Sequence, residues 1–276
     1  MLEHENKLDS IDILTLLFEQ HQIQPRNDLI NGVNLLYQDI KFEHRVFSNL
    51  TLDKNQFKNV VFECCDFENI IFTNNTLEHV YFINCNFVKI SFIDTFMENI
   101  SFSGSVMEFI NFTNICIISS NNNIDKTQGM MFIETRITNV AFYNSHIDDV
   151  NFQNAQLKNF EFIDTVIKDC WFKDTKLFSG HFIKSSITYC DFTKALLEYV
   201  HFYSIIINNS SFIKAYIVNC SWNLINFTDI DFSFATWSEC HMCNSNFINC
   251  LPDTHEIKIK TKIINSFWNN QEILNL

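Results

Sequence analysis

Large apolar residues recur at every fifth position along most of the chain. The frame runs from Phe42 to Ile117, resumes at Phe132 and continues to Phe247, and each of its positions holds Phe, Leu, Ile, Met or Trp. An α-helix places apolar residues three and four apart and a flat strand alternates them, so a spacing of five fits neither. Because repetition at a fixed spacing is typical of solenoids, we expect a chain that turns a corner after every fifth residue.

Two other positions of the five-residue unit are also restricted. The residue two places before the large one is usually small or short, as at Cys65, Ala155 and Ala195, so both positions are predicted to point inward. The residue two places after the large one is often Asn or Asp, as at Asn59 and Asp164. Asn and Asp hydrogen-bond to nearby backbone and tolerate turn conformations, so this position is predicted to form the corner.

The alternation of the large residue predicts the size of one coil. From about Phe132 to Ile217 it alternates between Phe and Ile or Leu, which requires an even number of edges per coil. Four edges form a square of about 20 residues, in which Cys65 and Cys85 stack as neighbours. Some ten coils, spaced like β-strands at about 4.8 Å, make a rod of about 48 Å. The predicted core residues of the repeat include Phe62, Phe82, Phe142, Phe162, Phe182 and Phe202.

The five-residue unit resembles that of the pentapeptide repeat superfamily, which combines a small residue, often Asp or Asn, with a Leu or Phe and two variable residues. Good copies are CNFVK at 85–89, CDFEN at 65–69 and CDFTK at 190–194. The resemblance extends over about residues 41–250. It implies an all-β fold, a right-handed quadrilateral β-helix with terminal helical caps.

The two ends and one interruption depart from the repeat. Residues 1–40 are predicted to form an N-terminal helical cap and lead-in, with a helix from Leu8 to Gln24 that ends before Pro25. Residues 118–131 lose the frame and then recover it, which predicts a loop of ten inserted residues within the repeat region, 41–250. Residues 251–276 are predicted to contain a strand at 256–264 and a short helix from Ser266, as a cap or a dimer contact.

The charge and the targeting signals restrict the partners. The formal net charge is −13, whereas direct binding of nucleic acid needs clustered Lys and Arg, so a basic protein surface fits better as a partner. The first residues have no basic segment followed by an apolar one, and no apolar run is long enough to span a bilayer. We therefore expect a bacterial cytoplasmic protein with no membrane contact, in which the 10 Cys are reduced.

Candidate chemistry is sparse. Cys240 and Cys243 form a C-x-x-C pair, but one is predicted to point inward and the other outward, so they do not face one metal ion. Glu161, His181 and His201 fall at the same outward position on three successive coils. A metal could be held there, although a solvated surface ladder is the favoured interpretation because a straight column does not converge on one point. Since phosphate-binding loops and nucleophile–base pairs are also missing, we expect no enzyme activity, no cofactor and no metal.

A second outward column consists of Tyr143, Ile163, Ile183 and Tyr203. Such a ladder either stabilises the stacked strands or forms a contact patch for a partner. Together with Phe267 and Trp268 near the C-terminus, these four residues are the candidate partner contacts.

Two functional hypotheses follow from the resemblance. In the first, the protein is a non-enzymatic rod that protects or modulates a type II topoisomerase such as gyrase by DNA mimicry, as quinolone-resistance-type members do, with a homodimer made through the C-terminal segment. The alternative is an interaction scaffold or host-directed effector with no topoisomerase role. The dispersed acidic residues favour the alternative.

Overall fold

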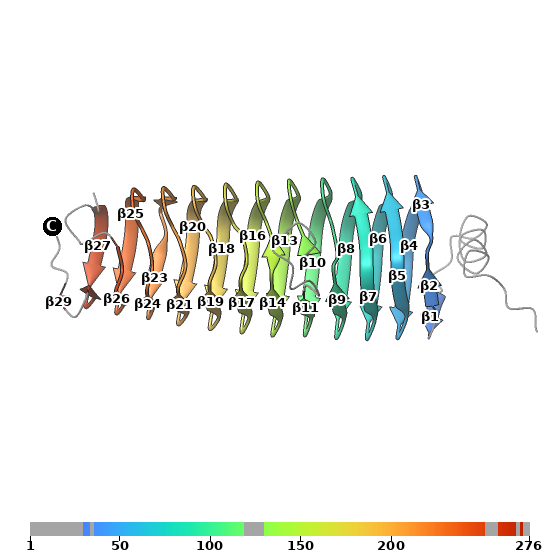
Figure 1. The fold of residues 1–276 in the computed structure, drawn as a ribbon, viewed down its shortest axis with the longest axis horizontal. Coiled ribbons are helices and arrows are strands. Elements are labelled where there is room, and N and C mark those ends of the chain that lie inside the picture. Colours follow the sequence, from blue (N-terminus) through green and yellow to red (C-terminus); the bar gives the residue numbers. More distant parts are fainter. Residues whose placement is uncertain (1–29, 34–35, 119–129, 252–258, 269–270, 273–276) are drawn as a thin grey trace, which may run out of the picture.

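The computed structural model describes residues 30–33, 36–118, 130–251, 259–268 and 271–272. In these residues the chain winds into a straight rod of about ten stacked coils, in which nearly all the strands are parallel (Figure 1). No helix occurs in this part of the chain. The described residues thus confirm an all-β parallel solenoid. The helix predicted at 8–24 lies outside them.

Two large sheets run along the rod. Sheet A contains β1 (Ile30–Val33), β4 (Val46–Asp53), β6 (Asp66–Thr73), β8 (Asn86–Ile93), β10 (Val106–Thr113), β13 (Arg136–Tyr143), β16 (Gln156–Ile163), β18 (Lys176–Ile183), β20 (Leu196–Tyr203), β22 (Tyr216–Val218), β23 (Ser221–Asn223), β25 (Thr236–Cys243) and β27 (Ile259–Ile264).

Sheet B contains β2 (Leu36–Gln38), β3 (Lys41–Glu43), β5 (Gln56–Glu63), β7 (Thr76–Ile83), β9 (Phe96–Glu98), β11 (Cys116–Ile118), β14 (His146–Asp148), β17 (Val166–Lys168), β19 (Ser186–Thr188), β21 (Ile206–Asn208), β24 (Asn226–Thr228), β26 (Asn246–Ile248), β28 (Phe267–Trp268) and β29 (Gln271–Glu272). A third, two-stranded sheet pairs β12 (Met130–Met131) with β15 (Val150–Asn151).

The corners follow the five-residue frame. From Asp39 to Asn114 and from Glu134 to Asn249, every fifth residue has a positive φ, and the non-glycine values lie between 47° and 61°. This left-handed conformation is strained for most residues and easiest for Gly, Asn and Asp, which explains why Asn and Asp predominate there. Bulky residues occupy a few corners at a conformational cost.

The pairing register measures the length of each coil. In the regular coils stacked partners are 20 residues apart, as for Phe142 and Phe162, so each of these coils has four edges of five residues. Between β10 and β13 the partners are 30 residues apart, as for Val106 and Arg136. This coil is therefore ten residues longer than the others, as the interrupted frame predicts. Most of the additional segment, residues 119–129, lies outside the described residues.

The interior is a set of parallel aromatic stacks. Phe142 and Phe162 have ring centroids 4.7 Å apart with planes 2° from parallel, and Phe162 and Phe182 have centroids 5.0 Å apart at 4°. This separation is close to the spacing of neighbouring β-strands, so the backbone ladder brings successive rings into register. All six predicted core residues are buried, but they belong to two stacks. Phe62 and Phe82 lie in a stack that continues through Phe102 to Phe132, whereas Phe142, Phe162, Phe182 and Phe202 form another.

The smaller inward residues satisfy backbone groups inside the corners. The Thr165 hydroxyl donates a hydrogen bond to the Phe142 carbonyl over 3.1 Å, and the Ser185 hydroxyl donates one to the Phe162 carbonyl over 3.1 Å. The stacked thiols of Cys65 and Cys85 are buried at the same position. Ser, Thr and Cys thus suit this position, because their side chains are short and each offers one hydrogen-bond donor to a carbonyl group in a confined space.

The C-terminal segment differs from the prediction. The short helix predicted from Ser266 is not formed in the described residues. Instead, β28 pairs in parallel with β26, and β29 turns back to pair antiparallel with β28. The exposed edge of the last coil offers unpaired backbone groups, and this pairing is more favourable for Phe267 and Trp268 than one isolated helical turn. Strand β27 lies within the segment predicted as a strand.

No helix among the described residues is long and apolar enough to cross a membrane.

Candidate partner-binding surface

Each long strand of sheet A contributes to two sides of the rod. The strand bends at its fourth residue, which has the positive φ of a corner, as at Asn139 in β13. We call the outward side chains of the first three strand residues the first face, and those of the last three the second face. Both faces cover the same interior and run along the rod from β4 to β25.

The second face contains the predicted apolar column. The pairings of β13 with β16, β16 with β18, and β18 with β20 place Tyr143, Ile163, Ile183 and Tyr203 directly above one another. The first three are half-buried, and Tyr203 is 46% exposed. The structure therefore brings these four candidate contacts together into one ladder. Phe267, which is also exposed, belongs to sheet B at the C-terminal end of the rod, whereas the ladder belongs to sheet A.

Beside this ladder lies the polar column of Glu161, His181 and His201. The Tyr143 hydroxyl donates a hydrogen bond of 2.5 Å to Oε2 of Glu161. The rings of His181 and His201 stack with centroids 5.2 Å apart, and Nδ1 of His201 lies 2.6 Å from the Ser221 hydroxyl oxygen. These side chains bond along the column rather than toward one point.

Two pKa values reflect this arrangement. Burial, and to a smaller extent the charge of His181, lowers the pKa of His201 below its ordinary value. The hydrogen bond to Glu161, followed by burial, raises the pKa of Tyr143. Both shifts favour neutral side chains on this face.

No group of three or more His, Cys, Asp or Glu side chains suited to holding a metal ion occurs in the described part of the chain. Cys240 is buried in the core, whereas Cys243 is a half-buried residue of the second face, in the inward and outward positions expected.

The second face is almost free of formal charge. Among its outward residues in the described strands, from Thr51 in β4 to Cys243 in β25, Asp53 and Glu161 are the only Asp, Glu, Lys or Arg. The Glu161 carboxylate is already hydrogen-bonded to Tyr143. In a chain of net charge −13, this side of the rod presents mainly Tyr, Ile, His and small polar residues.

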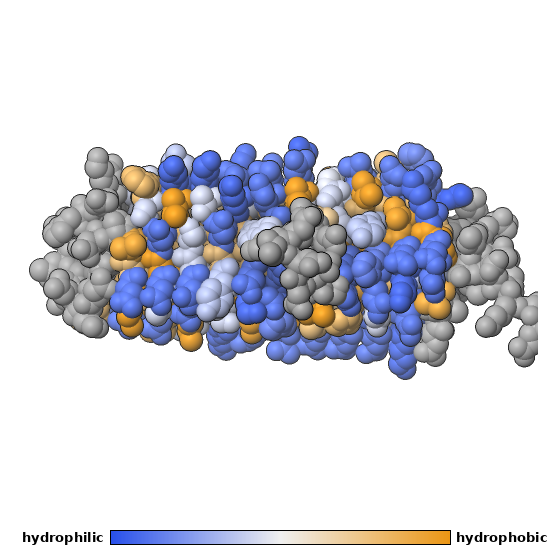
Figure 2. Space-filling view, viewed as in Figure 1, coloured by the Kyte–Doolittle hydropathy of each residue, from blue (hydrophilic) through white to orange (hydrophobic). Residues whose placement is uncertain are grey.

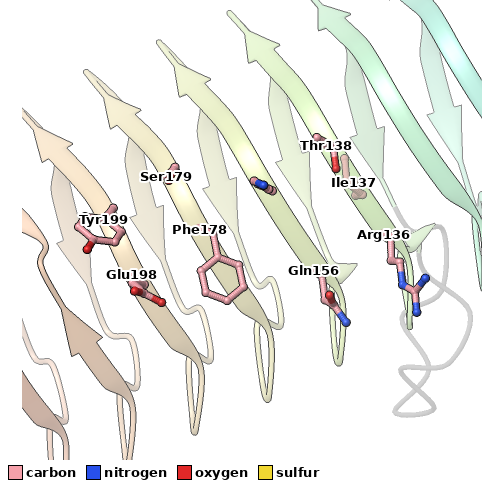
Figure 3. A pocket seen from close by; sticks show the side chains of 9 residues that line it. Arg136, Ile137, Thr138, Gln156, Phe178, Ser179, Glu198 and Tyr199 are labelled. Carbon is pink, nitrogen blue, oxygen red and sulfur yellow. The ribbon is translucent and has the colours of Figure 1, made fainter.

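Two shallow grooves meet at the corner between the faces. One, of about 520 Å³, lies on the side of the second face and is lined by Ala141, Glu161 and His181, among others. The other, of about 450 Å³, lies on the side of the first face between Arg136 and Tyr199, with Phe178 across its middle (Figure 3). Ser179 lines both grooves. The corner is hollow here because Ala141 and Ser179 are small.

Gly180 reveals how tightly the interior supports these grooves. Phe160 occupies an inward position that is Val in the coils of Val140 and Val200. A Cβ atom at Gly180 would lie 2.2 Å from Cε1 of Phe160, so the ring fills the space that a side chain would take. A large residue in one coil is therefore compensated by the absence of a side chain in the next.

Sequence reasoning missed the aromatic residues at the corners. Phe109, Tyr189, Tyr199 and Phe234 all have positive φ, and they are between 50% and 78% exposed. Bulky residues are rare in this conformation, and strained, exposed positions of this kind are concentrated at functional sites. The signal was present in the sequence as an aromatic residue at a position that usually holds Asn or Asp.

Elsewhere, the exposed apolar residues are more dispersed. Figure 2 shows one side of the rod, on which apolar side chains form separate spots among polar ones rather than a continuous patch. Single exposed apolar residues are normal on protein surfaces. The continuous ladder on the second face therefore differs from this background.

The fold and this surface define a class of protein, a parallel β-solenoid with one nearly uncharged side. The family model of pentapeptide repeats, in eight copies, matches residues 225–250. The match confirms the resemblance seen in the five-residue frame. No curated protein sequence matches the chain.

Several solved structures are similar to this one. QnrB1, a plasmid-mediated fluoroquinolone resistance protein, is 14% identical with a TM-score of 0.47, and the match covers 68% of this chain and 90% of that one. HetL, a pentapeptide repeat protein of the cyanobacterium Nostoc involved in regulating heterocyst differentiation, is 11% identical with a TM-score of 0.37 and 92% coverage of both chains. An exopolygalacturonase of Thermotoga maritima is 10% identical, with a TM-score of 0.44 and coverage of 95% and 88%. Because these TM-scores lie below 0.5, the similarities carry no argument about function.

Proposed function

We propose that the protein is a protein-binding rod whose contact surface is the second face between Tyr143 and Tyr203. One observation carries this proposal: in a chain of net charge −13, this face holds a continuous ladder of Tyr and Ile with hardly any charged residue. The centres of protein interfaces are depleted of charged residues and enriched in aromatic ones, and Tyr is prominent among the residues that dominate binding energy.

The ladder is suited to binding because it is rigid. Each of its residues lies on a strand that is paired on both sides, so its backbone is already ordered before a partner arrives. Ordering a flexible surface costs free energy on binding, and a preformed surface avoids most of that cost. His181, His201 and Glu161 beside the ladder add hydrogen-bonding groups for orientation. The partner we propose is a protein with an apolar centre and hydrogen-bonding groups at its edge.

Substitution on the ladder tests this proposal. We expect Ile183→Glu to abolish capture of a specific protein from a lysate of the producing cells, because a carboxylate would be buried in the contact without a partner. The matched control is Ile213→Glu, a half-buried outward residue in another part of the coil. The captured protein is then titrated against purified wild-type and variant protein by calorimetry. Equal affinity of both variants for it would contradict the proposed surface.

A narrower form of the proposal is that the partner is a type II topoisomerase and that the rod acts by DNA mimicry in the bacterial cytoplasm. The resemblance to the pentapeptide repeat superfamily and the net charge of −13 support it. The charges on and beside sheet B support it less, since acidic and basic side chains lie next to one another there. Lys168, for example, lies 3.3 Å from Asp148 and 3.0 Å from Asp169.

Purified gyrase provides the test of this narrower form. Supercoiling is measured with and without a fluoroquinolone while wild-type protein or Ile183→Glu is added. The topoisomerase hypothesis predicts rescue or inhibition at micromolar concentration by the wild type and loss of the effect in the variant. An absence of any effect from the folded wild type would favour the alternative, a scaffold or host-directed effector with no topoisomerase role.

A further inference from the structure

The first face of sheet A differs from the second because its charges are divided along the rod. Before the inserted segment it carries Asp66, Glu68 and Glu108, in β6 and β10. After the insertion it carries basic residues in three successive strands, namely Arg136, Lys158 and Lys176.

Four charged residues depart from this division. Glu198 lies in the basic half and Lys89 is at the corner beside the acidic half, and Glu134 and Asp174 occupy the corners just before β13 and β18. Among the outward residues of the strands themselves, the division holds along seven successive strands, from β4 to β18.

These charges are available to a partner. All six side chains of the two groups are exposed. None of the three basic residues has a salt-bridge partner among the described residues. When two such faces meet in opposite directions, the acidic half of each lies against the unpaired basic half of the other. A twofold symmetric contact requires this kind of self-complementarity.

We propose that two copies of this chain associate side by side and antiparallel through their first faces, related by a twofold axis between β10 and β13. Such an axis lies in the plane of the contact and perpendicular to the rod. It reverses the order of the coils but keeps the position along each strand, so that the first residue of a strand faces the first residue of its counterpart. In this arrangement β6 lies opposite β18 of the second copy, and β4 lies opposite β20.

Several of the residues that meet in this arrangement are complementary, whereas Lys158 comes opposite Val88 and Glu68 opposite Phe178. Asp66 comes opposite Lys176 of the second copy, and this contact occurs twice because of the symmetry. Val46, which is 60% exposed, comes opposite Leu196, beside the 50% exposed Tyr199. Glu108 lies next to the axis, where Arg136 of the second copy is within the reach of a long side chain. A parallel arrangement would instead place acids against acids and bases against bases.

Phe109 fits the same contact. It occupies the corner of β10, adjacent to the axis, with a φ of 57° and an exposure of 51%. A bulky apolar residue in this conformation is disfavoured in the isolated rod, both by its backbone and by its contact with water. In the antiparallel pair its ring packs at the edge of the contact, next to the groove that begins at Arg136 of the second copy (Figure 3).

The two faces thus have separate occupants. The second face remains open on both copies when the first faces are joined, because the strand turns a corner between them. The association does not depend on the partner proposed for the second face, and either proposal can fail without the other.

Charge exchange between the two halves tests the association. Sedimentation velocity of the 32.6 kDa chain is measured over a concentration series for the wild type, Asp66→Lys, Lys176→Asp and an equimolar mixture of the two variants. We expect the wild type to dimerise with an affinity that falls as salt is raised, because the contact is largely ionic. Each variant alone places like charges opposite each other in two contacts and should dimerise at least tenfold more weakly.

The mixture is the decisive sample. In a heterodimer of the two variants, Lys at position 66 faces Asp at position 176, and the native pair is kept at the other contact, so dimerisation should return to about the wild-type affinity. Both substituted residues are exposed, and circular dichroism verifies that the variants fold. A monomeric wild type at 100 micromolar, wild-type affinity in the single variants, or a mixture that fails to dimerise would each overturn the proposal.

Discussion

The two faces of sheet A are built on the same strands and the same interior, yet their surfaces differ. The first face carries acids in one half and bases in the other, whereas the second face has hardly any charged residue. The inward residues do not follow this difference. Phe142, Phe162 and Phe182 stack beneath the second face, and the apolar residues Ile137, Leu157 and Leu177 are buried beneath the first. In this rod the inward positions determine the fold, and the outward positions are free to differ from one side to the next.

The largest change in stability is expected at the contact between Gly180 and Phe160, which supports both faces from the interior. Gly180→Ala should lower the free energy of unfolding by about 2 kcal/mol, because the new methyl group overlaps the Phe160 ring and overpacked cores relax only at a cost. Chemical denaturation measures the change. Adding Phe160→Val to Gly180→Ala should recover part of the lost stability, because Val is the residue at this inward position in the coils of Val140 and Val200. A Gly180→Ala protein as stable as the wild type would show that this contact does not constrain the faces.

A second prediction concerns the independence of the faces. Ile183→Glu should abolish partner binding and leave the sedimentation behaviour unchanged, because Ile183 lies on the second face. Asp66→Lys should weaken self-association at least tenfold and leave the affinity for the partner unchanged. The comparison fails if either substitution changes both properties in a protein that circular dichroism shows to be folded.

A third prediction uses the strained corner at Phe109. Phe109→Asn should stabilise the monomer by about 1 kcal/mol, because Asn adopts the left-handed conformation more easily and its side chain is polar. The same substitution should weaken self-association, because the apolar contact beside the twofold axis is lost. Denaturation at low protein concentration measures the first effect, and sedimentation measures the second. A variant that dimerises as well as the wild type would remove Phe109 from the contact.

The smallest effect is a pH dependence confined to the second face. The pKa of His201 lies below its ordinary value of 6.5, so the unfolded chain binds a proton at a higher pH than the folded one. The contribution of His201 to the free energy of unfolding therefore decreases as the pH falls from 7.5 through 6.5. The decrease ends below the pKa that His201 has in the folded protein.

The His201→Asn variant should lose less stability than the wild type between pH 7.5 and pH 5.5, as measured by thermal unfolding. His181→Asn should keep most of the wild-type dependence, because burial is the larger cause of the lowered pKa. An identical pH dependence in His201→Asn and wild-type protein would contradict the assignment.

The architecture was largely predictable from the sequence because each coil repeats the same local rule. The frame containing Phe142 and Phe162 predicts a 20-residue register, and that register places Tyr143, Ile163, Ile183 and Tyr203 in one column. The ten additional residues between β10 and β13 follow from the same frame. Periodic features of this kind need no knowledge of distant contacts.

Other features depend on neighbours that the five-residue rule does not specify. The fit of the large Phe160 ring against Gly180 appears only when residues 20 apart are compared. The grooves likewise depend on small residues from different strands. At the C-terminus, Ser266 suggests a helix start, but the open edge of β26 provides backbone partners for β28. There, an available strand edge determines the conformation rather than local preference.

Small-angle X-ray scattering of the concentrated wild-type protein shows whether the charge-divided face joins two copies side by side. We expect a particle with the mass of two chains, a maximum dimension close to that of one rod and an increased cross-section. A particle with the mass of two chains and nearly twice the length would show an end-to-end contact. That result, or a single chain at every concentration, would contradict the side-by-side association.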